Sequence, residues 1–172
     1  MRRQRSGTIA LFGSLGSWTG AAGAGIYCAT KWAVSGLAES LRLELADFNV
    51  GVCVVEPGYF RTGFLKPGAR VAVEGRIGDY YGDGGDGDEG TAVGKMRGLL
   101  EAYDGKQAGD LGKGARVVVD VLSRGGGAGT VPVRLVLGSD CRAAIEGKCR
   151  STLEYLERER GVIDGTDYDE GE

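Results

Sequence analysis

Residues 25–32 read GIYCATKW and begin the longest segment of this 172-residue chain that has helical periodicity. Apolar side chains recur from there to Phe48, at Trp32, Ala33, Leu37, Leu41 and Leu45. Asn49 is a suitable stop signal, and the apolar, β-branched run Val50–Val55 follows it. Another apolar run, Thr8–Phe12, precedes the helix. The order strand, helix, strand predicts a βαβ unit with parallel strands and a right-handed crossover, so the expected fold class is α/β.

The two apolar runs have the length of strands. Thr8–Phe12 is continuously apolar after its threonine, which is typical of a strand buried on both faces. The second run ends at Glu56 and the strand-terminating pair Pro57-Gly58.

The rest of the chain alternates loops, helices and one more strand. We expect a loop over residues 59–90, with a flexible Gly/Asp tract at 78–90. Helices are predicted over 91–103, capped by Thr91, and over 108–122. The second of these would bury Val117, Val118, Val121 and Leu122.

A third strand, Val133–Leu137, is predicted around a single charged residue, Arg134. Ser139 and Asp140 can cap a last helix that runs to about Arg160. Its apolar residues are Ala144, Ile145, Leu153 and Leu156. We expect residues 1–160 to form one folded unit and the acidic tail 161–172 to be disordered.

Composition bounds the possible functions. The chain is 42% hydrophobic and 26% charged, with a net charge of -3, which fits one globular domain. Its basic residues are scattered apart from Arg2, Arg3 and Arg5, so we expect no nucleic-acid partner. No apolar run is long enough to span a bilayer, so we expect no membrane association.

The cysteines and the absent histidine restrict the chemistry. The 4 cysteines form no Cys-x-x-Cys pair and no signal peptide is evident, which favours reduced thiols and a cytoplasmic location. With 0 histidines, a Ser-His-Asp triad is excluded and the commonest metal ligand is missing, so no metal site is predicted. Acid/base chemistry would fall to tyrosine, lysine or carboxylates.

Tyr27 and Lys31 are the residues in which such chemistry can be recognised. They lie four positions apart at the start of the predicted helix, so both side chains project from one face. A neighbouring ammonium favours the phenolate form of tyrosine, which suits acid/base catalysis near neutral pH. Such a pair also occurs by chance on solvated helix faces. Ser14, thirteen positions before Tyr27 in a Gly/Ser segment after the first apolar run, favours the catalytic interpretation.

Ser14, the segment Tyr27-Cys28-Ala29-Thr30-Lys31, and Pro57-Gly58 followed by Thr62 resemble the C-terminal half of a short-chain dehydrogenase/reductase. The resemblance runs without a gap from about Ile9 to Phe64 and continues more weakly to about Asp140. It implies part of a Rossmann-type, doubly wound parallel sheet flanked by helices, with the first strands missing. It also implies that Met1 is an internal methionine of a longer chain.

The resemblance implies a role for each matching residue. Tyr27 would be the general acid or base, Ser14 would orient the substrate oxygen, and Lys31 would act on Tyr27 and hold the nicotinamide ribose. Pro57, Gly58, Phe60 and Thr62 would hold the carboxamide end of NAD or NADP. The substrate would be a small carbonyl compound or alcohol.

No phosphate-binding glycine turn is evident in these residues. Gly82–Gly87 satisfies the pattern G-x-G-x-x-G, but no buried strand leads into it and its carboxylates would repel a pyrophosphate. The choice between NAD and NADP is therefore open. A catalytically silent remnant that acts as an interaction module is the alternative to an active oxidoreductase.

The resemblance also implies a homo-oligomer formed through the helix that carries Tyr27 and Lys31. Small residues on that helix would allow close approach of a second copy, namely Ala33, Ser35, Gly36, Ala38 and Ser40. Without preceding strands, Thr8–Phe12 would present an unpaired sheet edge, which is a site for pairing with another chain.

Overall fold

A sheet of three parallel strands lies at the centre of the computed structural model, which describes residues 1–66, 68–69, 77–81, 90–124 and 127–168. The strands are β1 (Thr8–Phe12), β2 (Gly51–Pro57) and β3 (Arg134–Leu137), in the order β1-β2-β3. Both strand pairs are parallel. The three strands therefore end at the same edge of the sheet, where ligands bind in open α/β folds.

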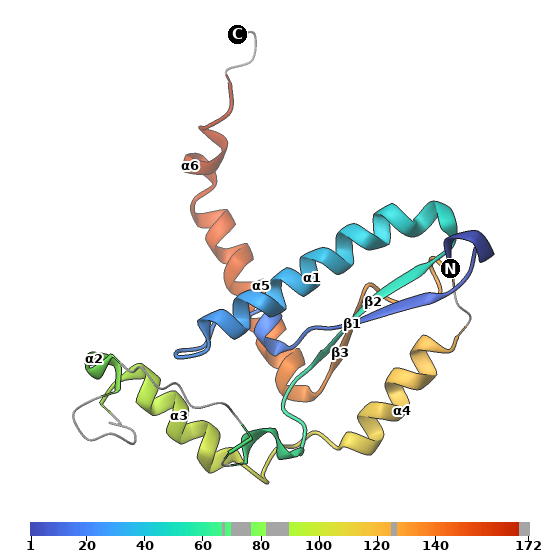
Figure 1. Ribbon diagram of the computed structural model, residues 1–172. Helices are drawn as coiled ribbons and strands as arrows, with labels where there is room; N and C mark the ends of the chain where they lie inside the picture. The colour runs from blue at the N-terminus through green and yellow to red at the C-terminus, as the bar shows by residue number, and fades with distance from the viewer. Residues whose placement is uncertain (67, 70–76, 82–89, 125–126, 169–172) are drawn as a thin grey trace.

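Helices cover both faces of the sheet (Figure 1). The long helix α1 (Gly25–Leu45) connects β1 to β2, and its Ala38 packs with Val52 and Val54 of β2. The helix α4 (Leu111–Leu122) lies on the opposite side, where Val118 and Leu122 pack against Cys53, Val55 and Val131. The predicted α/β class is confirmed, since the central strand β2 is buried between two helical layers.

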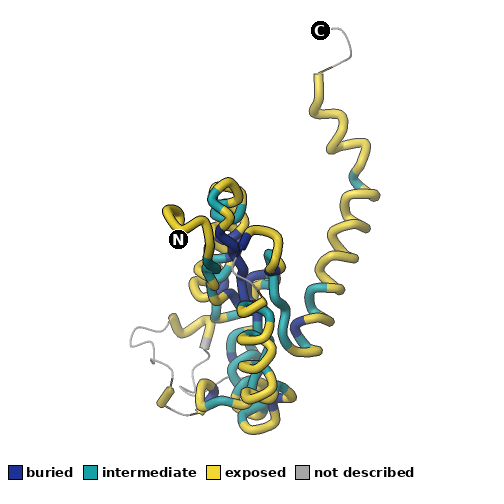
Figure 2. Tube along the Cα trace, turned by 90° about the vertical axis from the view of Figure 1, so that its right-hand side faces the viewer, coloured by how far each residue is buried: buried dark blue, intermediate teal, exposed yellow. Residues whose placement is uncertain are grey.

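The remaining elements are short turns at both edges of the sheet and four further helices. Single 3-10 turns are formed by η1 (Arg2–Gln4), η2 (Leu15–Ser17), η3 (Ala46–Phe48) and η4 (Gly63–Leu65). The helices are α2 (Gly78–Tyr81), α3 (Ala92–Tyr103), α5 (Ser139–Arg158) and α6 (Arg160–Asp164). Helix α5 extends away from the sheet, and most of its length is exposed (Figure 2).

Several local signals act as predicted. Asn49 ends the segment after α1 with a left-handed φ of 52°. Thr91 caps α3 by accepting a hydrogen bond from the backbone N–H of Gly94 at 3.0 Å. Helix α4 begins at Leu111 rather than at residue 108, because the side chain of Asp110 accepts from the backbone N–H of Lys113 and fixes the first turn there.

The prediction that β1 is buried on both faces is wrong. Ile9 and Leu11 pack against α1 and β2, but Phe12 is 58% exposed and Ala10 is also exposed. The opposite face of β1 has no covering element among the residues that the model describes. The same is true of its outer edge, because within that part of the chain β1 pairs with β2 alone.

The predicted apolar faces of three helices are partly wrong. In α1, Trp32 and Leu37 are about half exposed, whereas Ser35 and Ala38, expected to meet a second copy, are buried against the chain's own sheet. In α4, Val117 is 41% exposed. The last helix, α5, exposes Leu153 and Leu156. Helical spacing marks an apolar stripe, but the position of the sheet decides which side is covered.

The expected cap of the last helix is also wrong. Gly138 is the N-cap of α5, with φ 100° and no side-chain cap hydrogen bond. The carboxylate of Asp140 instead reaches the loop after β2. A distant backbone N–H therefore competes successfully with the local capping site.

Two predicted segments fall partly outside the described residues. The Gly82–Gly87 pattern lies outside them, as does most of the Gly/Asp tract 78–90, of which α2 forms the beginning. The end of the acidic tail, 169–172, is likewise outside them, whereas α6 occupies the start of that tail. None of the helices described is long and apolar enough to cross a membrane.

Candidate active site

A cavity of about 1550 Å³ opens at the carboxyl edge of the sheet. Its lining includes six of the seven residues that the sequence predicts for the site: Ser14, Tyr27, Pro57, Gly58, Phe60 and Thr62. Lys31 does not line it. Segments separated by 30 or more positions in the sequence therefore meet here because parallel strands end at one edge.

Ser14 stands directly after β1, at the start of η2. Its Oγ accepts a hydrogen bond from the backbone N–H of Gly16 at 3.2 Å, and its own N–H donates to Ser17 Oγ at 3.2 Å. The first bond uses a lone pair of Oγ and not its proton, so the hydroxyl can still donate to a ligand. Gly13 is required before it, since an added Cβ would lie 2.9 Å from Ser17 Oγ.

Tyr27 occupies the first turn of α1 and is 43% exposed. Its ring packs against η2, where an added Cβ on Gly16 would lie 3.1 Å from Tyr27 Cε1. The glycine therefore lets the serine turn approach the tyrosine ring. This contact places Ser14 and Tyr27 on neighbouring parts of the cavity wall.

Lys31 lies one helical turn after Tyr27. Its Nζ donates a hydrogen bond to the carbonyl oxygen of Phe12 at 2.9 Å and stands 5.8 Å from the centroid of the Tyr27 ring. The ammonium is thus held between the end of β1 and the tyrosine. Ser17 Oγ donates to the Lys31 carbonyl oxygen at 2.9 Å, which also ties the serine turn to α1.

The loop after β2 is held by Asp140, which the sequence predicts only as a helix cap. The backbone N–H of Tyr59 donates to Asp140 Oδ2 at 2.7 Å. Gly58 has no room for a side chain, because an added Cβ would lie 2.2 Å from Asp140 Oδ1. On the other side of the loop, Phe60 forms an isolated parallel bridge with Gly109. The loop is therefore clamped from two directions.

Tyr59 is a second tyrosine on the cavity wall. Burial raises the pKa of its hydroxyl, and the nearby Tyr27 and Asp140 raise that pKa further. Its ring meets that of Tyr103 edge to face, with centroids 5.6 Å apart. Tyr59 therefore remains protonated at neutral pH and is available as a hydrogen-bond donor.

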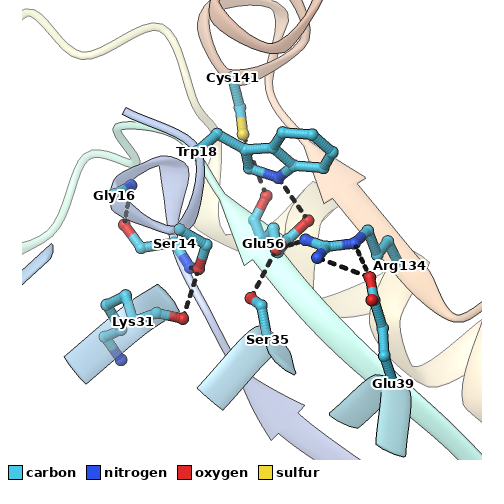
Figure 3. A network of polar contacts seen from close by, with 10 residues as sticks. Ser14, Gly16, Trp18, Lys31, Ser35, Glu39, Glu56, Arg134 and Cys141 are labelled. Carbon is cyan, nitrogen blue, oxygen red and sulfur yellow. Dashed lines mark hydrogen bonds and ion pairs between the residues drawn. The ribbon is translucent and has the colours of Figure 1, made fainter. Parts of the chain in front are cut away.

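An ionic network is built around the buried carboxylate of Glu56 (Figure 3). The carboxylate of Glu56, fully buried in β2, accepts hydrogen bonds from Ser35 Oγ and Trp18 Nε1, both at 2.9 Å, and pairs with Arg134. Arg134 also pairs with Glu39 at 2.7 Å, and its guanidinium lies 4.5 Å from the centroid of a Trp18 ring. The network joins the segment that carries Ser14 to α1, β2 and β3.

Sequence reasoning missed this network, although one signal was available. Glu56 and Arg134 are the single charged residues of two otherwise apolar strand runs, and neighbouring strands can bring such charges together. Above the network, the Cys141 thiol donates to the Glu56 carbonyl oxygen at 3.4 Å. Burial, with the nearby charge of Glu56, raises the pKa of that thiol to about 12.

The cavity is large and is lined by the hydroxyl-bearing residues of the candidate site. Its volume exceeds the 300–1,000 Å³ that is typical of a single-ligand pocket. Ser14 and Tyr27 bring hydroxyl groups to its wall, and Pro57, Gly58, Phe60 and Thr62 of the clamped loop also line it. For the pyrophosphate, no glycine turn that leads from a buried strand into a helix is found among the described residues.

Comparison with known proteins points to one family. Residues 1–70 match the family model described as short chain dehydrogenase, and this range includes all seven predicted site residues. The chain is 40% identical over 80 residues to 3-ketodihydrosphingosine reductase of Bacteroides thetaiotaomicron, covering 46% of this chain and 30% of that protein. It is 31% identical over 140 residues to oxidoreductase BOA17 of Botryotinia fuckeliana, covering 81% of this chain and 46% of that protein.

The fold is similar to that of a solved member of the same family. A short-chain dehydrogenase from Streptomyces avermitilis superposes with a TM-score of 0.76 at 32% identity, over 97% of this chain and 55% of that one. The chain thus spans less than half of the two curated relatives and about half of the solved structure. Similarity to oxidoreductases therefore covers the candidate site but only part of a whole enzyme.

Proposed function

We propose that this chain carries the catalytic and substrate-binding part of a short-chain dehydrogenase/reductase that interconverts a carbonyl group and an alcohol. The observation that carries the proposal is the meeting of Ser14 and Tyr27 on one cavity, with the Lys31 ammonium beside the Tyr27 ring. The match of residues 1–70 to the short chain dehydrogenase model supports it.

The reaction needs a hydride, which bound NADH or NADPH would supply to the carbonyl carbon. Tyr27 gives its hydroxyl proton to the substrate oxygen in reduction and takes it back in oxidation. Ser14 donates a hydrogen bond to the same oxygen and stabilises the negative charge that develops there. The Lys31 ammonium, 5.8 Å from the centroid of the Tyr27 ring, would attract the negative charge that the transfer leaves on the Tyr27 oxygen.

The cofactor would bind at the carboxyl edge of the sheet as well. Pro57, Gly58, Phe60 and Thr62 would hold the carboxamide end, and Lys31 and Tyr27 would face the ribose. Asp140 would act as a positioning residue for this loop through its bond to the Tyr59 N–H. The proposal is made for NAD(P) as a class, because no residue here distinguishes NAD from NADP.

Titration of the purified chain with NADH and NADPH tests the proposal. We expect saturable binding of at least one cofactor, and at least tenfold weaker binding in Lys31→Ala. Lys95→Ala is the matched control, since Lys95 is exposed on α3 and is not part of the cavity lining. Absence of binding at millimolar concentrations of both cofactors would rule out catalysis by these residues alone.

A catalytically silent interaction module is the second candidate. The observation in its favour is the outer edge of β1, beside which no other strand lies within the described residues, together with the exposed Phe12. In that case the chain would bind no cofactor but would pair with a strand of another chain. The cofactor titration separates the two candidates.

We also propose a homo-oligomer formed through the outer face of α1. Ala33, Gly36 and Ser40 remain exposed there, together with half-exposed Trp32 and Leu37. Sedimentation equilibrium should show a dimer or larger assembly that Gly36→Arg dissociates and Gly147→Arg, on the exposed side of α5, leaves intact. A monomer at all concentrations would refute this proposal.

A further inference from the structure

The cavity continues beyond Tyr27 between two helices that present apolar side chains to it. Helix α3 contributes Val93, Met96 and Leu100, which recur at helical spacing and so share one face. Helix α4 contributes Leu111, Val118 and Val119. These six residues are called the apolar wall.

Helix α3 is held close to the loop that leads into α1, the helix that carries Tyr27. Gly23, with a φ of +75°, lies in the loop before α1, and an added Cβ there would stand 3.1 Å from Val93 Cγ1. The apolar wall therefore begins next to the segment that leads into Tyr27. A ligand whose oxygen meets Ser14 and Tyr27 would direct its remaining atoms along this wall.

Much of the apolar surface at the cavity is not packed against other parts of the described chain. Phe12, Phe64, Leu111 and Val119 line the cavity, yet each is more than half exposed. Contiguous apolar surface of this kind marks sites where an apolar ligand or partner binds, because covering it removes water from hydrocarbon.

The charged groups at the cavity offer little to an ionised ligand. Arg97 and Glu101 line it together, and they neutralise each other in an ion pair of 3.1 Å. Lys66 is exposed to solvent, where water screens its charge, and Asp104 follows the last turn of α3. A carboxylate or phosphate placed against the apolar wall would lose its hydration without a buried partner.

We infer that the cavity takes an uncharged, mainly hydrocarbon carbonyl compound or alcohol, whose hydrocarbon body lies against the apolar wall. The position of its oxygen at Ser14 and Tyr27 rests on the proposed function, whereas the apolar recognition rests on the wall itself. The volume of about 1550 Å³ leaves room for such a body beside a nicotinamide ring.

Equilibrium dialysis with 2-decanone and with decanoate tests this inference. The two probes have equal chain length and differ in charge. We expect saturable binding of 2-decanone, at least tenfold weaker binding of decanoate, and at least tenfold weaker binding of 2-decanone in Leu111→Asp. Leu111 is 58% exposed, so the folded chain should tolerate this substitution.

Leu99→Asp is the matched control, because Leu99 is 66% exposed on α3 and does not line this cavity. It should bind 2-decanone within twofold of the unmodified chain. No binding of 2-decanone up to its solubility limit, equal affinity for the two probes, or equal loss in both variants would overturn the inference.

The assay contains no cofactor and measures no turnover, so the two proposals can fail separately. Binding of 2-decanone without any cofactor binding would leave the substrate class intact and remove the reductase. Cofactor binding without 2-decanone binding would leave the reductase proposal intact and remove the substrate class.

Discussion

At the scale of single residues, Tyr27 is placed by contacts that do not involve its hydroxyl. Gly16 lies against one side of the ring, and the Lys31 ammonium stands 5.8 Å from its centroid. The hydroxyl can therefore be removed while the ring stays in position. Catalysis and packing are separable at this residue.

We expect Tyr27→Phe to lower the rate of NAD(P)H-dependent ketone reduction at least about 100-fold, because a positioned acid/base group contributes 10²–10⁴-fold. The free energy of unfolding should change by less than about 1 kcal/mol. Steady-state kinetics and urea unfolding measure the two effects. Tyr80→Phe, at an exposed tyrosine outside the cavity, should alter neither. An undiminished rate in Tyr27→Phe would exclude Tyr27 as the acid.

The four cysteines, all free, should differ sharply in reactivity. Cys28, Cys53 and Cys141 are buried and Cys149 is exposed. With a pKa of about 12, Cys141 is thiolate in only about one molecule in 10⁴ at pH 8. Iodoacetamide at pH 8 should therefore label Cys149 alone, and all four cysteines after denaturation, as read by mass spectrometry. Cys149→Ser should remain unlabelled when folded. Equal labelling of Cys141 and Cys149 would contradict the buried position of Cys141.

At the scale of elements, α4 depends on a titratable cap. Asp110 Oδ1 accepts from the backbone N–H of Lys113 at 3.0 Å, and this hydrogen bond lowers the pKa of the carboxyl below its ordinary value of 3.8. A lowered pKa in the folded state means that the ionised form stabilises the fold. The contribution is fully present above pH 3.8 and is lost as the pH falls through the lower, folded value.

Asp110→Asn tests this cap, because asparagine keeps a capping oxygen but does not titrate. The urea midpoint of the unmodified chain should exceed that of Asp110→Asn at pH 7, and the difference should shrink below about pH 4. Asp110→Ala, which removes the capping oxygen, should have a lowered midpoint at every pH. A constant difference between Asp and Asn from pH 7 to pH 2 would show that the charge has no role.

At the scale of the whole molecule, the Glu56 network connects the paired strands β2 and β3 to α1 and to the segment after Ser14. Arg134 comes from β3, Glu56 from β2, and Ser35 from α1. Trp18 joins them from the segment after Ser14. Loss of Glu56 would therefore loosen both the sheet and the serine turn.

Glu56→Ala should lower the free energy of unfolding by about 3–5 kcal/mol, since it leaves the partly buried Arg134 without its buried partner. Glu39→Ala removes the other carboxylate on the same arginine, but Glu39 is 52% exposed, so the loss should stay below about 1 kcal/mol. Urea unfolding of the two variants makes the comparison. Equal losses would show that the buried pair contributes no more than the exposed one.

Local patterns predicted the elements well because periodicity and caps act within a few residues. Apolar spacing predicts the strands now found at 8–12 and 51–57 and the helix between them. Thr91 caps α3 and Asn49 ends the segment after α1, as their local sequence predicts. The same local spacing is why Tyr27 and Lys31 lie one turn apart. The match to the short chain dehydrogenase model covers this same part of the chain.

Contacts between distant segments could not be predicted in this way. The buried sides of α1 and β1 depend on which elements lie beside them, so Trp32 and Phe12 were misassigned. Asp140 was expected to cap its own helix, yet it binds a backbone N–H 81 positions away. The cavity and its apolar wall likewise arise only where α3 and α4 approach the sheet edge.

The sequence by itself determined the α/β order of elements and the candidate catalytic residues, because those depend on short-range spacing. The tertiary structure alone decided that Ser14, Tyr27 and loop 57–62 share one cavity, and that Asp140 and Glu56 hold its parts in place. The physical reason is that buried polar groups must find partners wherever the packed chain offers them, whatever their separation in sequence.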